Sequence, residues 1–418
     1  MSTVPGTEST ALMAVTGQQP PVRELLALSG RALPLLRAWV AENPRLGVAR
    51  ALLTLATSES FSDAALREEL VIAHRDAQEV DERSASLVYG VFLHTHRQYR
   101  LTADHLIEHF ACWPGDELAS LMLDAFAACG DDSYRVQGDE LIERQCAHVG
   151  PDSWPWLGRL AWTRAEQGRP EEAFELATLA LDRFPRAGLA AHARAHAEQE
   201  SGAGPASTAF LDGWLAADPQ AIQFKHLNWH AALQSIACGD FADARRRADE
   251  VLGRGDVGMR SATNWRLLLA GQQPAGRCDL DHIRELLAAP GGMAEVFHTF
   301  NLALALAVEA ATDDLSALAH RAEDDARTEY RDVLAPVVRS LAAVTAGHSQ
   351  QAVTLLTPLG TAVRRIGGVR VEREIVQDTL ARALVDIGEH TRAADLLHHR
   401  ITARRHHRYE DLLLSSAT

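Results

Sequence analysis

Apolar residues recur at three- and four-residue steps along most of this chain, the pattern of amphipathic helices. The first such stretch follows Val22 in RELLALSGRALPLLRAWVAENP, and it closes on Asn43 and Pro44, a common helix stop. The sequence contains no sustained alternation of apolar and polar residues, which is the strand pattern. The pattern therefore predicts an all-α protein.

A Gly-x-x-x-x-Ala spacing marks turns between pairs of helical stretches. The segment 154–187 also fits a 34-residue tetratricopeptide (TPR) unit. Glycine permits the backbone angles of a tight turn, and a small residue lets two helices approach closely. We therefore expect a superhelical array of TPR-like helical hairpins, an α-solenoid. The spacing occurs at Gly168 and Ala173, Gly239 and Ala244, Gly347 and Ala352, and Gly388 and Ala393.

The pattern also predicts how the chain is divided. Residues 1–21 mix Ser, Thr, Gly, Pro and Gln without a period, which indicates a mobile N-terminal arm. A single hairpin cannot bury its apolar face alone, so stacked neighbours must supply the core. We expect one TPR-like solenoid over residues 22–405 and a C-terminal tail over residues 406–418.

Composition and charge exclude some classes of function. The 418-residue chain has a formal net charge of −15, which repels nucleic-acid phosphates and anionic membranes. Its five cysteines never form a C-x-x-C spacing, which argues against a disulfide framework and favours a reducing compartment. No run of 18 apolar residues is present. We expect a cytoplasmic protein that binds neither nucleic acid nor membrane.

Two His-x-x-x-His pairs stand out as candidate chemistry: His192 with His196, and His226 with His230. Residues four apart lie on one helix face, so each pair can present two imidazoles to one point. Imidazole at this spacing suits a divalent transition metal such as Zn, Fe, Cu or Ni, with a carboxylate such as Glu200 assisting. Without a metal, His196 or His230 could act as a general base near pH 7.

A structural alternative stays open for the same histidines. They could hydrogen-bond across packed helices and only position the stack, which is the commoner role of isolated histidine pairs in helical proteins.

The residues around the pairs resemble the tetratricopeptide repeat protein 38 family. That family carries a His-x-x-x-His helix, a Trp-containing segment and then a His-x-x-Trp-His-x-Ala-Leu helix, which match residues 192–196, Trp214 and residues 226–233. The resemblance covers roughly residues 35–400. It implies an all-helical superhelix and no particular reaction. Leu227 and Gln199 depart from the family, which usually has Asn and an acidic residue at these positions.

Other motifs are less indicative. The segment HLIEH at residues 105–109 matches the inverted zinc-protease pattern H-x-x-E-H, but no protease context surrounds it, and a solvated helix face is the expected reading. The sequence has no Walker loop, no G-x-G-x-x-G after a strand and no G-x-S-x-G elbow. Common nucleotide and serine-hydrolase chemistry is therefore not indicated.

Together these features predict a cytoplasmic helical repeat protein that binds a small molecule or a peptide. The concave face of a solenoid is its usual binding surface, and Trp229, Asn228, Trp265 and Glu200 are the expected ligand contacts. The alternative is an enzyme, for example of specialised metabolism, with a His-rich and metal-binding site in the centre of the solenoid.

Overall fold

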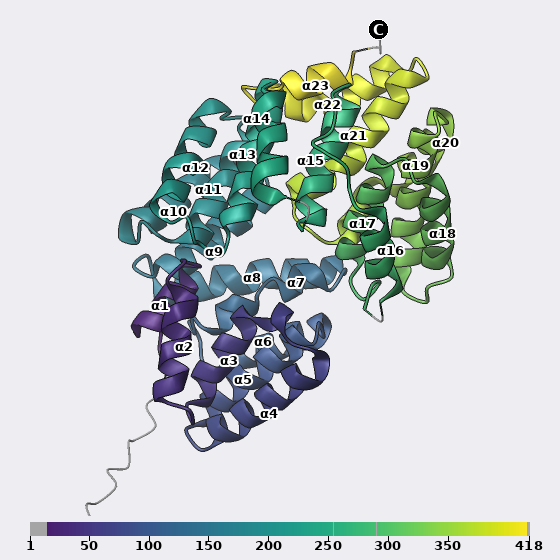
Figure 1. Cartoon of the computed structure of the whole chain (residues 1–418). Coiled ribbons are helices and arrows are strands. Elements are labelled where there is room, and N and C mark those ends of the chain that lie inside the picture. Colours follow the sequence, from purple (N-terminus) through teal and green to yellow (C-terminus); the bar gives the residue numbers. More distant parts are fainter. Residues whose placement is uncertain (1–14, 254, 290, 416–418) are drawn as a thin grey trace, which may run out of the picture. The chain divides into compact units, whose positions relative to one another are not determined.

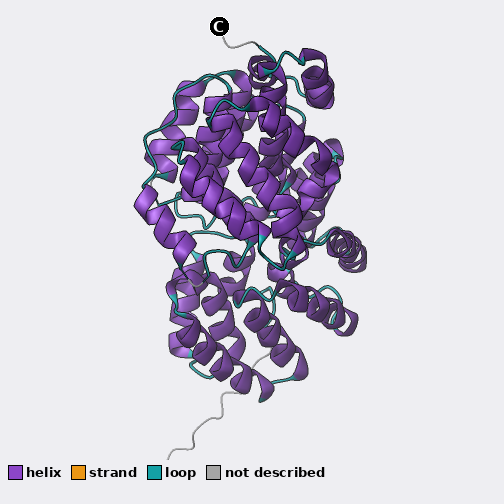
Figure 2. Ribbon diagram, turned by 90° about the vertical axis from the view of Figure 1, so that its right-hand side faces the viewer, coloured by secondary structure: helices purple, strands orange, loops and turns teal. Residues whose placement is uncertain are grey.

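A computed structural model describes residues 15–253, 255–289 and 291–415. All regular secondary structure in these residues is helical, which confirms the predicted all-α fold (Figure 2). The chain divides into two compact units (Figure 1): unit 1 contains residues 1–26 and 31–125, and unit 2 contains residues 27–30 and 126–418. Residues 1–14 of the expected arm lie outside the described residues. A single array over residues 22–405 stays a prediction.

Unit 1 is built from antiparallel helical neighbours, with α3 packed on α4 and α5 packed on α6. Its helices are α1 (Pro20–Leu26), α2 (Ala32–Glu42), α3 (Gly47–Ala56), η1 (Ser58–Ser60), α4 (Asp63–Gln78), α5 (Glu82–Thr95), α6 (Tyr99–Cys112) and η2 (Ala119–Met122).

Unit 2 continues with helical hairpins in which sequence neighbours pack on each other. Its first helices are α7 (Ala125–Ala128), α8 (Asp132–Val149), α9 (Trp154–Glu166), α10 (Pro170–Arg183), α11 (Gly188–Glu200), α12 (Pro205–Ala217), α13 (Phe224–Cys238), α14 (Phe241–Arg246), η3 (Arg247–Leu252) and α15 (Val257–Leu269). The remaining ones are α16 (Leu280–Ala288), α17 (Val296–Val308), α18 (Thr312–Glu323), η4 (Tyr330–Leu334), α19 (Ala335–Thr345), α20 (Ser349–Leu356), η5 (Thr357–Ile366), α21 (Arg370–Asp386), α22 (His390–Ala403) and α23 (Arg408–Leu413).

The four predicted hairpin turns are all present in unit 2. Gly168, Gly239, Gly347 and Gly388 each stand between two helices with φ of 74°, 81°, 76° and 84°, in the left-handed region that glycine adopts without strain. The alanine five residues after each glycine is 0% exposed. The TPR-like unit at 154–187 forms the α9–α10 hairpin, so the hairpin prediction is confirmed there.

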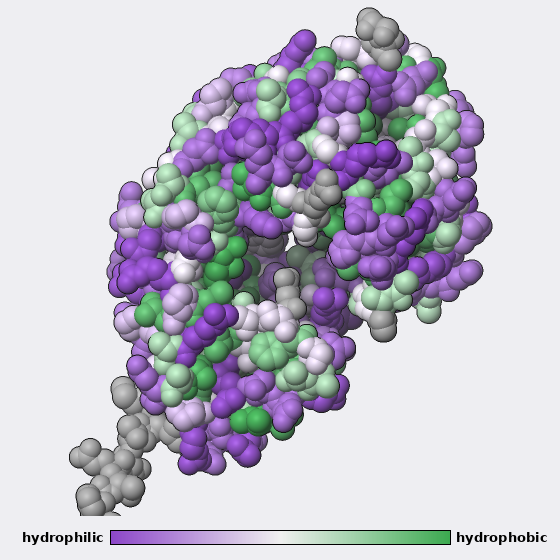
Figure 3. Space-filling view, viewed as in Figure 1, coloured by the Kyte–Doolittle hydropathy of each residue, from purple (hydrophilic) through white to green (hydrophobic). Residues whose placement is uncertain are grey.

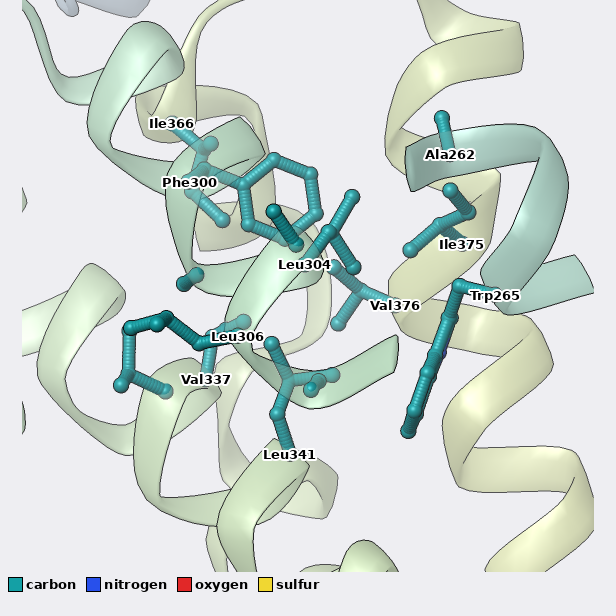
Figure 4. Close-up of a cluster of buried hydrophobic side chains, with 14 of the residues drawn as sticks. Ala262, Trp265, Phe300, Leu304, Leu306, Val337, Leu341, Ile366, Ile375 and Val376 are labelled. Carbon is teal, nitrogen blue, oxygen red and sulfur yellow. The ribbon is translucent and has the colours of Figure 1, made fainter. Parts of the chain in front are cut away.

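The largest apolar core of unit 2 lies among α15, α17, α19 and α21 (Figure 4). Trp265, Phe300 and Leu304 are 2%, 1% and 0% exposed at its centre. Such burial supplies about 1.5–3 kcal/mol for each large apolar side chain. This core carries most of the hydrophobic stabilisation of the C-terminal hairpins.

The C-terminal segment packs back onto earlier helices of unit 2. Helix α23 contacts α13 and α21. The backbone N–H of Arg405 donates to the carbonyl oxygen of Ser201 at 3.2 Å, and His406 Nδ1 lies 2.8 Å from the carbonyl oxygen of Gly202. A side chain at Gly202 would meet Arg404 atoms 2.7 Å away, so glycine is required for this approach. The segment expected to be a tail thus contains α23.

Buried ion pairs join α21, α22 and α23. Glu374 accepts from Arg400 at 3.1 Å and from Arg404 at 2.6 Å, Arg400 also donates to Asp378 at 2.5 Å, and Arg404 donates to Glu410 at 2.9 Å. Glu374, Arg400, Arg404 and Glu410 line a small pocket. Burial opposes ionisation of Glu374, but the charges of the two arginines outweigh it and lower its pKa to about 2. Glu374 therefore stays charged at neutral pH.

No helix in the described part of the chain is long and apolar enough to cross a membrane. On the face shown in Figure 3, hydrophilic residues cover most of the surface over α16 and α18.

The ion pairs predict a large effect of one substitution. Replacing Glu374 by Gln should destabilise unit 2 by about 3–5 kcal/mol, because two buried arginines lose their shared carboxylate. Scanning calorimetry should show a lower thermal midpoint. The control is Glu389→Gln, which breaks an exposed pair with Arg392 and should change the midpoint little. Equal shifts in the two variants would contradict the importance of the buried network.

Candidate metal centre

The two histidine pairs lie on helices α11 and α13, which pack side by side (Figure 1). Every described residue of α11 apart from Leu189 and Arg194 is buried, and the segment from Leu227 to Ala237 of α13 is buried on all sides. Helices buried all round have no polar face, so their polar side chains must find partners inside the protein. The Nε2 atoms of the histidines of α11 and α13 contact one another.

All four imidazoles meet at one point. His192 Nε2 lies 2.9 Å from His196 Nε2 and 2.9 Å from His226 Nε2, and His226 Nε2 lies 3.2 Å from His230 Nε2. One nitrogen of each ring lies within 4.8 Å of the corresponding nitrogens of the other three. The ring centroid of His192 is 4.6, 4.5 and 5.0 Å from those of His196, His226 and His230. The structure therefore brings both predicted pairs together into one cluster.

Burial keeps these imidazoles neutral. His192, His196 and His230 are 8%, 3% and 1% exposed, and His226 is partly buried. Burial lowers the pKa of His196 to about 3 and that of His226 to about 4. Burial and then the neighbouring imidazoles lower the pKa of His192 and His230 well below the usual range. Each ring therefore offers a lone pair at neutral pH, which is the form that binds metal.

Hydrogen bonds alone cannot satisfy this cluster. In a neutral imidazole each nitrogen has either one N–H or one lone pair. His192 Nε2 and His226 Nε2 each have two nitrogen neighbours, so one proton or one lone pair would have to serve two contacts. Four lone pairs directed at one cation have no such conflict. The donor set thus fits a metal better than a hydrogen-bonded cluster.

The spacing also fits a metal. Four nitrogens 2.0–2.1 Å from a tetrahedral Zn²⁺ are about 3.3 Å apart. The three contacts of 2.9, 2.9 and 3.2 Å among the Nε2 atoms are close to this separation.

Glu166, at the end of α9, is a site residue that the sequence did not indicate. Its carboxylate oxygen lies 4.0 Å from His196 Nδ1, and both of its oxygens accept from the backbone N–H of Arg370 at 3.0 Å. A carboxylate beside the second nitrogen of a ligand histidine orients the ring and raises its basicity. The Nδ1 atoms of His192 and His230 have no hydrogen-bond partner among the described residues. The only sequence feature that could have pointed to Glu166 is its position two residues before Gly168, the turn glycine of the α9–α10 hairpin.

The four residues expected to contact a ligand are all buried. Trp229 is 1% exposed, and its ring centroid lies 5.1 Å from that of His230. Asn228 accepts from Arg247 at 3.0 Å, and the Trp265 indole donates to Thr379 at 2.9 Å. Asn228 and Trp265 therefore bond within the protein, and only Trp229 borders the cluster. Ligand binding by these residues stays a prediction.

Glu200 follows His196 on the same helix stripe but contacts other groups. Its carboxylate lies 3.5 Å from Arg370 and 3.9 Å from Arg404. Burial and then the charge of Glu374 raise its pKa to about 7. Glu198 accepts instead from Arg194 at 2.9 Å. Neither carboxylate is in hydrogen-bonding contact with the four imidazoles in the described structure.

Comparisons with known proteins add little to this picture. No protein-family model matches the chain, and no curated protein matches it. A solved complex described as "Structure of Naa15/Naa10 bound to HypK-THB" is similar at 12% sequence identity and a TM-score of 0.21. The match covers 90% of this chain and 66% of that one, just under two thirds of its length. A likeness of this size supports no family or function, and the tetratricopeptide repeat protein 38 family stays a resemblance.

The lowered pKa values predict a pH dependence of stability in metal-free protein. The pKa of His226 falls from 6.5 to about 4 on folding, so its contribution to stability is present above pH 6.5 and is lost as the pH falls toward 4. Between these values the unfolding free energy should decrease by about 1.4 kcal/mol per pH unit for this histidine alone. Chemical denaturation from pH 7 to pH 5 measures the slope.

A histidine variant checks the source of that slope. His226→Gln should show a shallower pH dependence than the unmodified protein, whereas His320→Gln, which removes an exposed histidine, should leave it almost unchanged. Identical slopes for all three proteins would contradict a buried neutral His226.

Proposed function

We propose that this helical repeat protein binds a divalent transition metal through His192, His196, His226 and His230. The supporting observation is the convergence of four neutral imidazoles, three buried and one partly buried, on one point. Neutral imidazole is a ligand for Zn, Cu, Ni and Fe, whereas Mg and Ca prefer oxygen. The donor set therefore favours the first group of metals.

The ligand in this proposal is an ion rather than a peptide or a small organic molecule. Trp229 and Trp265 pack inside the protein, and a larger ligand would have to displace them. A metal ion needs no more space than the centre of the four rings.

The number of ligands bears on the role of the metal. Four histidines fill the shell of a tetrahedral Zn²⁺, which is typical of structural sites, since catalytic zinc keeps one position for water or substrate. Metals that accept five or six ligands would retain open positions beside the four imidazoles. A metal-dependent form of the enzyme alternative would therefore require such a metal, which would supply Lewis-acid chemistry there.

Within the chain, Glu166 and Arg370 would position this centre. Glu166 is held by the backbone N–H of Arg370, and its carboxylate lies 4.0 Å from His196 Nδ1, beyond a direct hydrogen bond but close enough to favour an N–H at that nitrogen. A proton at Nδ1 would leave His196 Nε2 unprotonated for the metal.

Elemental analysis tests the proposal directly. Protein purified without a histidine tag, or reconstituted with Zn²⁺, Cu²⁺, Ni²⁺ or Co²⁺ and then desalted, should contain about one metal ion per chain, as expected for one four-ligand site. His196→Ala and His230→Ala should each lose most of it, because each removes one of four ligands. His320→Ala is the matched control at an exposed position and should retain the metal.

Thermal stability gives a second readout. Because metal binds the folded chain, a chelator should lower the thermal midpoint of the loaded protein. If free metal was present at a hundred times its dissociation constant, removing it should lower the unfolding free energy by about 2.7 kcal/mol. The His196→Ala variant should not respond to the chelator. Absence of bound metal under all loading conditions would overturn the proposal and leave the cluster with a packing role.

A further inference from the structure

A second group of polar side chains lies in unit 1, between α5 and α6. Ser86 Oγ is 2.9 Å from His109 Nδ1, and His109 Nε2 is 3.0 Å from Asp116 Oδ2. These residues come from α5, α6 and the loop that follows α6. His109 belongs to the HLIEH segment, and the expectation of a solvated helix face is wrong for it because its side chain is 0% exposed.

The positions of the protons follow from the partners. Asp116 accepts from Arg83 at 2.7 Å and from the backbone N–H of Leu118 at 3.0 Å. Burial raises the pKa of Asp116, but its hydrogen bond to His109 and the Arg83 charge outweigh burial, and the net shift is downward. An ionised carboxylate only accepts, so His109 Nε2 carries the proton and Nδ1 has a lone pair. Ser86 therefore donates its hydroxyl proton to His109 Nδ1.

These hydrogen bonds run in the direction that activates a serine as a nucleophile. A base holds the hydroxyl proton, and a buried carboxylate fixes the tautomer of the base and stabilises its protonated form. The two imidazole nitrogens are exchanged relative to the usual Ser-His-Asp arrangement, in which Nε2 faces the serine, but the roles are the same.

A second imidazole lies on the other side of Ser86. His105 Nε2 is 2.8 Å from the carbonyl oxygen of Ser86 and 3.3 Å from its Oγ. Since a carbonyl oxygen only accepts, this nitrogen carries a proton. Burial lowers the pKa of His105, which favours its neutral form. This N–H is therefore engaged by the backbone of α5, and the His105 ring borders the Ser86 hydroxyl.

The site is open on the serine side. Ser86 is partly exposed, whereas His109 and Asp116 are buried. Tyr89, one turn further along α5, is 45% exposed, and its ring lies edge-on to His105 with centroids 5.1 Å apart. An apolar group of a substrate could therefore rest on Tyr89 while its reacting atom approaches Ser86 Oγ.

We propose that Ser86 is a nucleophile for carboxylic esters with an apolar acyl group, with His109 as its general base and Asp116 as the residue that positions His109. Ser86 Oγ attacks the carbonyl carbon and its proton passes to His109 Nδ1. The alcohol leaves with that proton, and water then hydrolyses the acyl-serine to release the carboxylic acid. This activity is independent of the histidine cluster in unit 2.

A fluorophosphonate probe carrying an alkyl chain tests the nucleophile. Attack by Ser86 Oγ breaks the P–F bond, releases fluoride and leaves a phosphonylated serine. Mass spectrometry of the digested full-length protein should place one adduct on the peptide with Ser86. Ser86→Ala should abolish labelling without changing the thermal midpoint. The control is Ser84→Ala, which replaces a buried serine two residues earlier in α5 and should be labelled normally.

The positioning role of Asp116 has its own readout. Asp116→Asn should lower the labelling rate by about 100-fold or more, because the amide no longer fixes the His109 tautomer that accepts the serine proton. If Asp116→Asn fails to fold, the position of the adduct and the result for Ser86→Ala still test whether Ser86 is the nucleophile. No adduct on Ser86, an adduct on other serines only, or labelling that survives Ser86→Ala would overturn the proposal.

Discussion

Contacts between alanines in the α9–α10–α11 region are the constraint on which the histidine cluster depends. Ala161, Ala177 and Ala193 meet in one layer, and Ala165, Ala173 and Ala197 meet in the next, all 2% exposed or less. A methyl side chain permits close helix axes and loses no rotamer entropy when buried. Helix α11 is consequently enclosed on all sides. Water is removed from its histidines, which keeps their rings neutral and able to donate lone pairs.

The hairpins and the histidine pairing could be predicted because both depend on local spacing. A glycine followed five residues later by alanine indicates a turn whatever surrounds it, and an i,i+4 pair shares a face in any helix. One site containing all four histidines was also expected, but spacing alone does not require His192 to meet His226, since α12 intervenes and only the stacking of hairpins brings α11 to α13. Glu166 was not predictable, because its approach to His196 requires the registration of α9 against α11.

Ser86 shows the same limit more clearly. The sequence has no nucleophile elbow, and the proposed nucleophile lies inside a helix, with its partners on another helix and in a loop. His109 was expected on a solvated face because no protease context surrounds HLIEH. The contact between α5 and α6, and the ion pair of Asp116 with Arg83, place these groups together. A linear motif cannot encode such a contact, which arises only when helices pack.

The return of α23 onto α13 has a consequence for synthesis of the chain. About 170 residues separate the two helices, and a ribosome adding 5–20 residues per second needs roughly 10–35 s to cover that distance. During this interval α13 lacks one of its packing neighbours, although its hairpin with α12 can already form. Unit 2 therefore cannot reach its final packing hairpin by hairpin as an open repeat array could. The synthesis of α23 therefore decides when α13 gains its full set of packing neighbours within unit 2.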